Sequence, residues 1–337
     1  MTVRALWYDR HTLHLIDQHR LPGHLIVRHL RTVQGTAEAI RTMVVRGAPA
    51  IGVAAAYGMA LASRQRGMTP TRAAVLLRAT RPTAYDLFVG IEVVRSAWAR
   101  GDDPEAAALA YCARVVGECR KIGEAGAPLF RQANKVLTHC NAGALATVEW
   151  GTALAPIRVA HDRGVRLFVW VDETRPLLQG SRLTAWELDQ EKIPHAIIAD
   201  NAAGYYLRNG DVDAVIVGAD RIARNGDFAN KIGTYEKAVL AHENGVPFYV
   251  AAPWSTFDVA RKDGTTIPVE ERDEAEVLDL GTQRIAPKKS HARNPAFDIT
   301  PAKYVTGFVT PVGVMRPGGL SRFLLQHRAR SVAPARP

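Results

Sequence analysis

The sequence predicts an α/β protein in which a mostly helical N-terminal domain with a small β appendage precedes a Rossmann-like domain with a parallel sheet. Changes in the spacing of apolar residues lead to this prediction. Residues 1–30 alternate polar and apolar positions, residues 36–135 repeat apolar positions at helical spacing, and the rest alternates short apolar runs with helical segments. The last pattern is typical of βαβ units around a parallel sheet. We therefore expect domains over 1–130 and 131–325 and a flexible tail over 326–337.

The N-terminal domain begins with three alternating segments, ALWYD, LHLID and HLIVRHL, which predict a small antiparallel sheet. Five segments with an apolar face follow and predict helices, several of them with proline in the first turn, where its missing N–H costs nothing. These helices are expected over 36–45, 49–65, 70–80, 84–99 and 104–125.

The second domain is predicted from five short apolar runs, VLTH, RLFVWV, HAIIA, DAVIVGA and PFYVAA, each separated by helical segments. Right-handed crossovers between such strands build a Rossmann-like sheet. Residues 253–301 are rich in Pro, Asp, Lys and Arg and predict a long surface excursion. Such excursions usually carry function or contact a partner subunit.

Composition excludes several classes of protein. The formal net charge is +10, but no basic stripe with interleaved aromatic residues occurs, so we expect no nucleic-acid partner. The charge indicates an arginine-rich surface or attraction of a phosphorylated substrate. No apolar run approaches the roughly 20 residues of a membrane helix and no signal peptide opens the chain, so no membrane association is expected. Cys112, Cys119 and Cys140 are too few for a disulfide framework, which favours the reducing cytoplasm.

Polar side chains follow four of the predicted strands. Cys140, Asp172, Asp200 and Asp220 each come directly after an apolar run. In open α/β sheets ligands bind outside the carboxyl ends of the strands, so these side chains are expected at one edge. No dinucleotide or nucleoside-triphosphate glycine motif and no serine-hydrolase elbow is present. A metal held by the carboxylates is possible, but no histidine joins them at a useful spacing. A thiol and an acid with cations nearby suit proton transfer on a phosphorylated metabolite.

Each of these residues also has a structural interpretation. Cys112 and Cys119 are expected to be buried packing residues. Cys140 precedes a small-residue turn that we expect to open a helix, whose N-terminus would lower the thiol pKa and attract anions. For Asp220, position alone favours a structural role, because the aspartate could cap or turn the chain. Asp172 and Glu173 are expected to pair with Arg175, and Asp200 to cap the following helix.

Six long motifs resemble those of methylthioribose-1-phosphate isomerases. They are RGAPAIGVAAAYG (46–58), LTHCNAGALAT (137–147), DETRPLLQGSRLTAWEL (172–188), GADRIARNGDFANKIGTY (218–235), VPFYVAAPWSTFD (246–258) and NPAFDITP (294–301). The resemblance runs from about residue 7 to the 310s. Ribose-1,5-bisphosphate isomerases and regulatory subunits of a translation-factor exchange complex belong to the same superfamily.

The resemblance implies a set of site residues. The cysteine of THCNAG, here Cys140, assists catalysis, and the aspartate of GADRI, here Asp220, is the general acid. Substrate contacts fall on Arg46, Gly47, Ala48, Arg81, Gln179, Asn230 and Lys231. Arginine and lysine can neutralise a phosphate, and glycine lets backbone N–H groups approach it. A homodimer is also expected from the resemblance, built through the Rossmann-like half with help from 253–301.

The implied reaction converts 5-methylthioribose 1-phosphate to 5-methylthioribulose 1-phosphate in methionine salvage, without metal or redox cofactor. Asp220 must be protonated, which burial would promote. Cys140 either shuttles the C2 proton or stabilises a hydride shift, and both routes fit the sequence. The rivals are an isomerase of 5-deoxyribose 1-phosphate or ribose 1,5-bisphosphate, a non-catalytic translation-factor scaffold, and a nucleotide-dependent oxidoreductase. The scaffold would lack Cys140 and Asp220, and the oxidoreductase would need the missing glycine motif.

Overall fold

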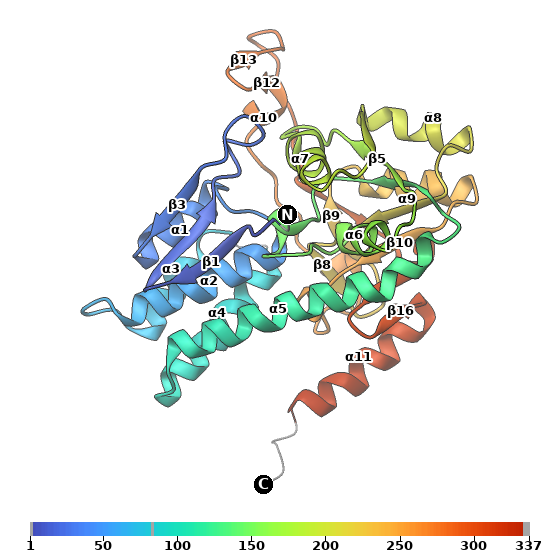
Figure 1. The fold of residues 1–337 in the computed structure, drawn as a ribbon. Helices are drawn as coiled ribbons and strands as arrows, with labels where there is room; N and C mark the ends of the chain where they lie inside the picture. The colour runs from blue at the N-terminus through green and yellow to red at the C-terminus, as the bar shows by residue number, and fades with distance from the viewer. Residues whose placement is uncertain (1–2, 82–83, 333–337) are drawn as a thin grey trace.

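The computed structural model describes residues 3–81 and 84–332, with side chains described as far as Gln326. Its N-terminal part opens with an antiparallel sheet in the order β1-β2-β3 and continues with helices (Figure 1). The predicted β appendage and helical region are both confirmed. The strands are β1 (Leu6–Asp9), β2 (Thr12–Ile16) and β3 (Val27–Leu30), and the helices are α1 (Val33–Arg41), α2 (Ala48–Ser63), α3 (Pro70–Arg78), α4 (Tyr85–Arg100) and α5 (Pro104–Gly126).

Helix α2 is the centre of this part because it is apolar on all sides and buried from Ala48 to Ala62. Helices α4 and α5 pack on it. A Cβ atom on Gly90 of α4 would lie 2.1 Å from the carbonyl oxygen of Gly52 in α2, so only glycine permits this crossing. The close backbone contact fixes the start of α2 relative to α4.

The Rossmann-like part contains a seven-stranded sheet in the order β16-β15-β10-β7-β4-β5-β6. All neighbours are parallel except the antiparallel pair β15–β16. The central strand β7 is buried at every position, as its unbroken apolar run predicts. The strands are β4 (Lys135–Thr138), β5 (Phe168–Asp172), β6 (His195–Ile198), β7 (Ala214–Val217), β10 (Phe248–Ala251), β15 (Gly307–Thr310) and β16 (Gly313–Met315), with helices α6 (Leu154–Asp162), α7 (Ala185–Gln190), α8 (Ala203–Arg208) and α9 (Thr234–Glu243).

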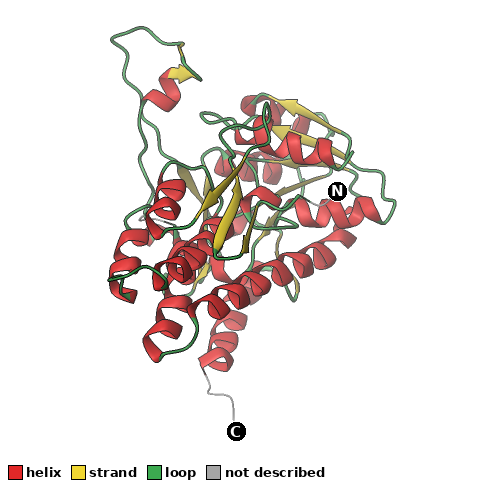
Figure 2. Cartoon of the chain, turned by 60° about the vertical axis from the view of Figure 1, so that its left-hand side comes forward, coloured by secondary structure: helices red, strands yellow, loops and turns green. Residues whose placement is uncertain are grey.

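The predicted excursion over 253–301 contains short elements of its own. The excursion supplies β11 (Phe257–Asp258) and β14 (Phe297–Thr300) to a second sheet. The order of this sheet is β11-β8-β9-β14, and its other two strands, β8 (Arg221–Ala223) and β9 (Phe228–Lys231), precede the excursion. Between its last two strands in the chain lie α10 (Ala275–Leu278) and a hairpin of β12 (Asp279–Leu280) and β13 (Gln283–Arg284). The hairpin projects away from the body of the molecule in both ribbon views (Figures 1 and 2).

The last described element is α11 (Pro317–Val332), so most of the segment expected to be a flexible tail is helical in the structure. Residues 333–337 lie outside the described residues. Within the described chain, no helix combines the length and apolarity that crossing a membrane requires.

Candidate active site

One pocket, with a volume of about 70 Å³, brings together every residue expected at the site. It lies where the start of α2 meets the carboxyl ends of the sheet strands. Arg46, Gly47, Ala48 and Arg81 come from the helical part, and the others follow strands or lie in loops of the Rossmann-like part. The lining includes Arg46, Gly47, Ala48, Arg81, Cys140, Gln179, Asp220, Asn230 and Lys231.

Cys140 is held in place through its backbone. Its N–H donates to Thr174 Oγ1 at 2.8 Å, and its carbonyl accepts from Thr184 Oγ1 at 2.6 Å. Its φ of 62° is left-handed, which costs a residue other than glycine about 1–2 kcal/mol. The two threonines therefore fix the thiol in a direction that an ordinary strand end would not give.

The helix expected directly after Cys140 is absent from the structure, and this prediction was wrong. Only a 3₁₀ turn, η2 (Ala144–Ala146), follows, and α6 begins at Leu154. The N–H groups of Ala144 and Leu145 donate to the buried carboxylate of Glu187 at 2.7 and 3.2 Å. These N–H groups therefore bind the carboxylate of Glu187 and not the thiol of Cys140.

The environment of Cys140 shifts its pKa upward, opposite to the expected direction. Burial is the largest cause and raises the thiol pKa, while the charges of Arg46 and Lys231 partly lower it. Without substrate, Cys140 is therefore a neutral thiol at neutral pH.

Asp220 lies in the loop after β7, and its N–H donates to the carbonyl of Ala229 at 2.9 Å. Burial raises the pKa of its carboxyl, and the nearby charges of Lys231, Arg46 and Arg81 lower it by less. The net upward shift keeps a proton on Asp220 to higher pH than on an exposed aspartate. The predicted acid is therefore in an environment that can supply a proton.

Arg46 and Gly47 form the wall at the start of α2. The guanidinium of Arg46 donates to Asn141 Oδ1 at 2.6 Å and to the Asn141 carbonyl at 2.8 Å. Gly47 has φ 93°, and a Cβ there would lie 2.4 Å from the Cα of Ala146. The N-terminus of a long helix attracts anions through its free N–H groups. This wall is therefore suited to a phosphate.

Lys231 and Arg81 supply further positive charge. Lys231 donates to the carbonyl of Ala296 at 2.7 Å, and its ammonium lies 4.7 Å from the ring centre of Phe297. Burial lowers the pKa of Lys231, and the neighbouring Cys140 and Asp220 raise it. Arg81 forms an ion pair with Glu270 at 3.4 Å.

Gln179 and Asn230 are the amides of the pocket. Gln179 is only 5% exposed, and among the described atoms its Oε1 has no hydrogen-bond partner. Asn230 donates through Nδ2 to Thr234 Oγ1 at 2.9 Å. A buried acceptor without a donor is costly in a closed site, so Gln179 is suited to bind a hydroxyl group.

The loop that carries Gln179 is shaped by Asp200, which does not cap a helix as expected. Its carboxylate accepts from the N–H groups of Thr174 and Arg175, both at 2.7 Å. Asp200 begins the short 3₁₀ turn η4 (Asp200–Ala202), for which no side-chain cap is formed. The carboxylate instead binds the backbone of the loop that follows the neighbouring strand β5.

The sequence interpretation missed a buried group around His139, which also lines the pocket. His139 Nδ1 lies 3.0 Å from Asp172 Oδ2, and Nε2 lies 2.8 Å from the carbonyl oxygen of Ile232. Lys237 Nζ lies 3.3 Å from the same Asp172 oxygen. A histidine therefore does join the carboxylates, contrary to expectation. Its position directly before Cys140 in THCNAG was the signal that could have identified it.

The expected ion pair of Asp172 with Arg175 is also wrong, because the Arg175 guanidinium donates to the carbonyls of Pro176 and Val277. Atoms of His139, Asp172 and Asp200 that could act as metal ligands lie within 4.8 Å of one another. Since Lys237 already pairs with Asp172, we interpret this group as an internal charge network.

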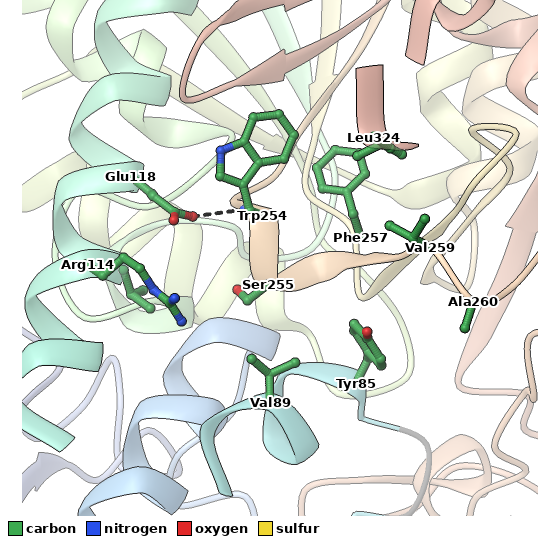
Figure 3. A pocket seen from close by; sticks show the side chains of 11 residues that line it. Tyr85, Val89, Arg114, Glu118, Trp254, Ser255, Phe257, Val259, Ala260 and Leu324 are labelled. Atoms are coloured by element: carbon green, nitrogen blue, oxygen red, sulfur yellow. Dashed lines mark hydrogen bonds between the residues drawn. The ribbon is translucent and has the colours of Figure 1, made fainter. Parts of the chain in front are cut away.

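A larger cavity of about 460 Å³ lies between α4, α5, α11 and residues 254–260 (Figure 3). Figure 3 shows Arg114 and Glu118 on one wall and aromatic side chains such as Trp254 and Phe257 on another. Its lining residues contain no cysteine and no second acid beside Glu118. We therefore assign the chemistry to the smaller pocket.

Comparisons with known proteins show which family and which proteins this chain resembles. The model of the Initiation factor 2 subunit family matches residues 44–317. Methylthioribose-1-phosphate isomerase of Geotalea daltonii is 49% identical over 333 residues, covering 94% of this chain and 96% of the relative. The 5-deoxyribose 1-phosphate isomerase of Moorella thermoacetica is 50% identical over 328 residues, covering 92% and 93%. The crystal structure of 5-methylthioribose 1-phosphate isomerase from Pyrococcus horikoshii has a TM-score of 0.87 at 42% identity and covers 97% of this chain and 96% of its own.

Proposed function

The chain belongs to the Initiation factor 2 subunit family, and we propose that it is an isomerase that converts 5-methylthioribose 1-phosphate to 5-methylthioribulose 1-phosphate in methionine salvage. The main support is the pocket in which a thiol and a half-buried acid lie among Arg46, Arg81 and Lys231. The names of similar proteins support the same substrate.

Asp220 is the proposed general acid. The 1-phosphate locks the anomeric carbon in a ring acetal, so the bond between C1 and the ring oxygen must break before isomerisation. Asp220 gives its proton to the ring oxygen as that bond breaks, and its raised pKa supports this role. Hydrogen then moves from C2 to C1, and the C2 hydroxyl loses its proton to the Asp220 carboxylate as it becomes a carbonyl.

Cys140 is the proposed second catalytic residue, and two routes remain open for it. In one, the Cys140 thiolate takes the proton from C2, becomes a thiol, and gives a proton to C1. In the other, hydride moves directly and Cys140 only stabilises the transition state. A resting thiol must lose its proton before it can act as a base, so the upward shift of its pKa supports the hydride route.

Arg46, Arg81 and Lys231 are proposed to bind the phosphate together with Gly47 and Ala48 at the start of α2. Their positive charges also stabilise negative charge that develops during the reaction. Gln179 and Asn230 are proposed to bind the sugar hydroxyls.

A relative named for 5-deoxyribose 1-phosphate supports a second candidate substrate. The kcat/KM values of the purified protein on 5-methylthioribose 1-phosphate, 5-deoxyribose 1-phosphate and ribose 1,5-bisphosphate decide between them. We expect the highest value for the methylthio sugar. A higher kcat/KM for either competitor would reassign the substrate. If none of the three sugar phosphates were turned over, the proposal of an isomerase would be refuted.

Arg46→Ala and Lys231→Ala are expected to raise KM roughly ten- to a hundredfold. Each removes a charge-assisted contact to phosphate, worth about 1.5–3 kcal/mol. If the contact is equally strong in the bound substrate and the transition state, kcat stays near its native value. Steady-state kinetics measure both constants, with Arg100→Ala as a control on an exposed arginine. Unchanged KM in both site variants would place the phosphate elsewhere.

We also expect a homodimer, acting in the cytoplasm without nucleic acid or membrane. Apolar side chains are exposed at Leu280 on the hairpin, at Ile285 directly after it, and at Ile197 and Tyr205 on the Rossmann-like part. Burial of such side chains against a second copy would stabilise the dimer. Free cysteines support a reducing compartment. Light scattering at micromolar concentration measures the mass, and a monomer would contradict this prediction.

A further inference from the structure

A buried carboxyl joins the two halves that form the site. Asp86, in the first turn of α4, is fully buried, and so is Thr256. Thr256 belongs to the short turn η5 (Trp254–Thr256), which follows β10 of the large sheet. Its hydroxyl donates to Asp86 Oδ2 at 3.3 Å. The bond therefore runs from the helical part to the Rossmann-like part.

The backbone around Asp86 belongs to the same rigid unit as one wall of the pocket. A Cβ on Gly52 of α2 would lie 2.7 Å from the carbonyl oxygen of Asp86. Helix α2 begins at the pocket with Gly47 and Ala48, and Arg81 precedes α4 by a few residues. A shift of Asp86 would therefore move these substrate-side groups together.

A cavity and further polar side chains adjoin this bond. The 460 Å³ cavity adjoins it, lined by Ser255 next to Thr256 and by Tyr85 and Val89 of α4 (Figure 3). The backbone N–H of Trp254 donates to Glu118 of α5 at 2.9 Å, so a second hydrogen bond holds η5 against the helical part.

We propose that Asp86 is a positioning residue for the isomerase reaction: through its bond to Thr256 it fixes the wall with Gly47, Ala48 and Arg81 relative to Cys140 and Asp220. This inference rests on the proposed function. Asp86 does not line the pocket, so it acts through the groups that do.

Electrostatics make the contact sensitive to pH. The pKa of Asp86 is raised from 3.8 to about 7. Desolvation is the largest cause and raises it, the polar side chains of Ser255 and Thr256 lower it, and the charges of Asp220 and Glu118 raise it. Tyr111 of α5 and Arg221 of β8 also interact electrostatically with Asp86. Asp86 is therefore largely protonated below neutral pH, and Asn is a close neutral substitute.

This shift has a defined sign in stability. The folded state keeps a proton on Asp86 that the unfolded state releases near its ordinary pKa of 3.8. Its contribution to stability therefore falls as pH rises from about 4 to about 7 and is constant above that. The stability of Asp86→Asn lacks this pH-dependent contribution. The variant should therefore become more stable relative to the native protein as pH rises from about 4 to about 7.

The test uses Thr256→Val, Thr256→Ser and Asp86→Asn in the full chain. Thr256→Val removes the donor at nearly constant volume, and we expect kcat/KM to fall roughly five- to tenfold, mainly through KM, as for one lost hydrogen bond. Thr256→Ser should restore the native value. Asp86→Asn should keep kcat and KM within about threefold, because its amide oxygen still accepts from Thr256.

Two outcomes would overturn the proposal. One is an unchanged KM in Thr256→Val, and the other is an unchanged pH dependence of stability in Asp86→Asn. Denaturant unfolding from pH 4 to 8, with a double-mutant cycle between the two positions, measures the contact without substrate. A protein that is stabilised by this contact but turns over no sugar phosphate would refute the proposed function and leave the contact standing.

Discussion

Asp220→Asn should lower kcat by about 10²–10⁴ while substrate affinity stays largely unchanged. Asparagine keeps the size of the side chain and can still hydrogen-bond, but it cannot deliver a proton to the ring oxygen. The buried environment that raises the Asp220 pKa is the reason to expect so large an effect. Kinetics at saturating substrate measure kcat, and a binding titration measures affinity.

The pH dependence and a matched variant complete this test. Native kcat should fall as pH rises through the raised pKa of Asp220, because the acid loses its proton there, and Asp220→Asn should lack this limb. Asp263→Asn changes an aspartate outside the pocket that caps η6 (Gly264–Thr266) and serves as the control. A near-native kcat in Asp220→Asn would remove Asp220 from the reaction.

Cys140→Ser should also reduce kcat strongly, by about 10²-fold or more if the thiol takes the C2 proton. The hydroxyl preserves the shape and the bonds to Thr174 and Thr184 but hardly ionises. Cys112→Ser and Cys119→Ser change buried cysteines outside the pocket and serve as controls for the substitution. Near-native kcat in Cys140→Ser would overturn its assignment.

Turnover in heavy water separates the two routes for Cys140. If the thiol takes the C2 proton and exchanges it with solvent, deuterium appears at C1 of the ketose. A direct hydride shift leaves C1 without deuterium. Proton NMR of the product distinguishes these results, and the raised thiol pKa leads us to expect little deuterium.

Much of the fold followed from local patterns. Strand β7 reads as an unbroken apolar run because both faces are buried, and the helices of the N-terminal part showed apolar faces at helical spacing. The rule that ligands bind at the carboxyl ends of parallel strands was enough to place Cys140 and Asp220 at one edge of the sheet. Arg46 and Lys231 were predicted as substrate-binding residues from the family resemblance, because no local pattern in the sequence links them to this edge of the sheet.

The errors concern contacts between segments distant in the chain. Glu187 takes the amides after Cys140, and Lys237 rather than Arg175 pairs with Asp172. Asp200 accepts from the N–H of Thr174, which follows the neighbouring strand. Such partners depend on how strands and loops are placed in space, and spacing along the sequence gives no information about them.

The most direct test of the central claim follows the conversion of 5-methylthioribose 1-phosphate by carbon NMR, with the native protein and Asp220→Asn side by side. We predict that the ketose carbonyl signal grows with the native protein and at least about a hundredfold more slowly with the variant, which still binds the substrate. No ketose from the native protein, or equal rates from the two proteins, would contradict the account.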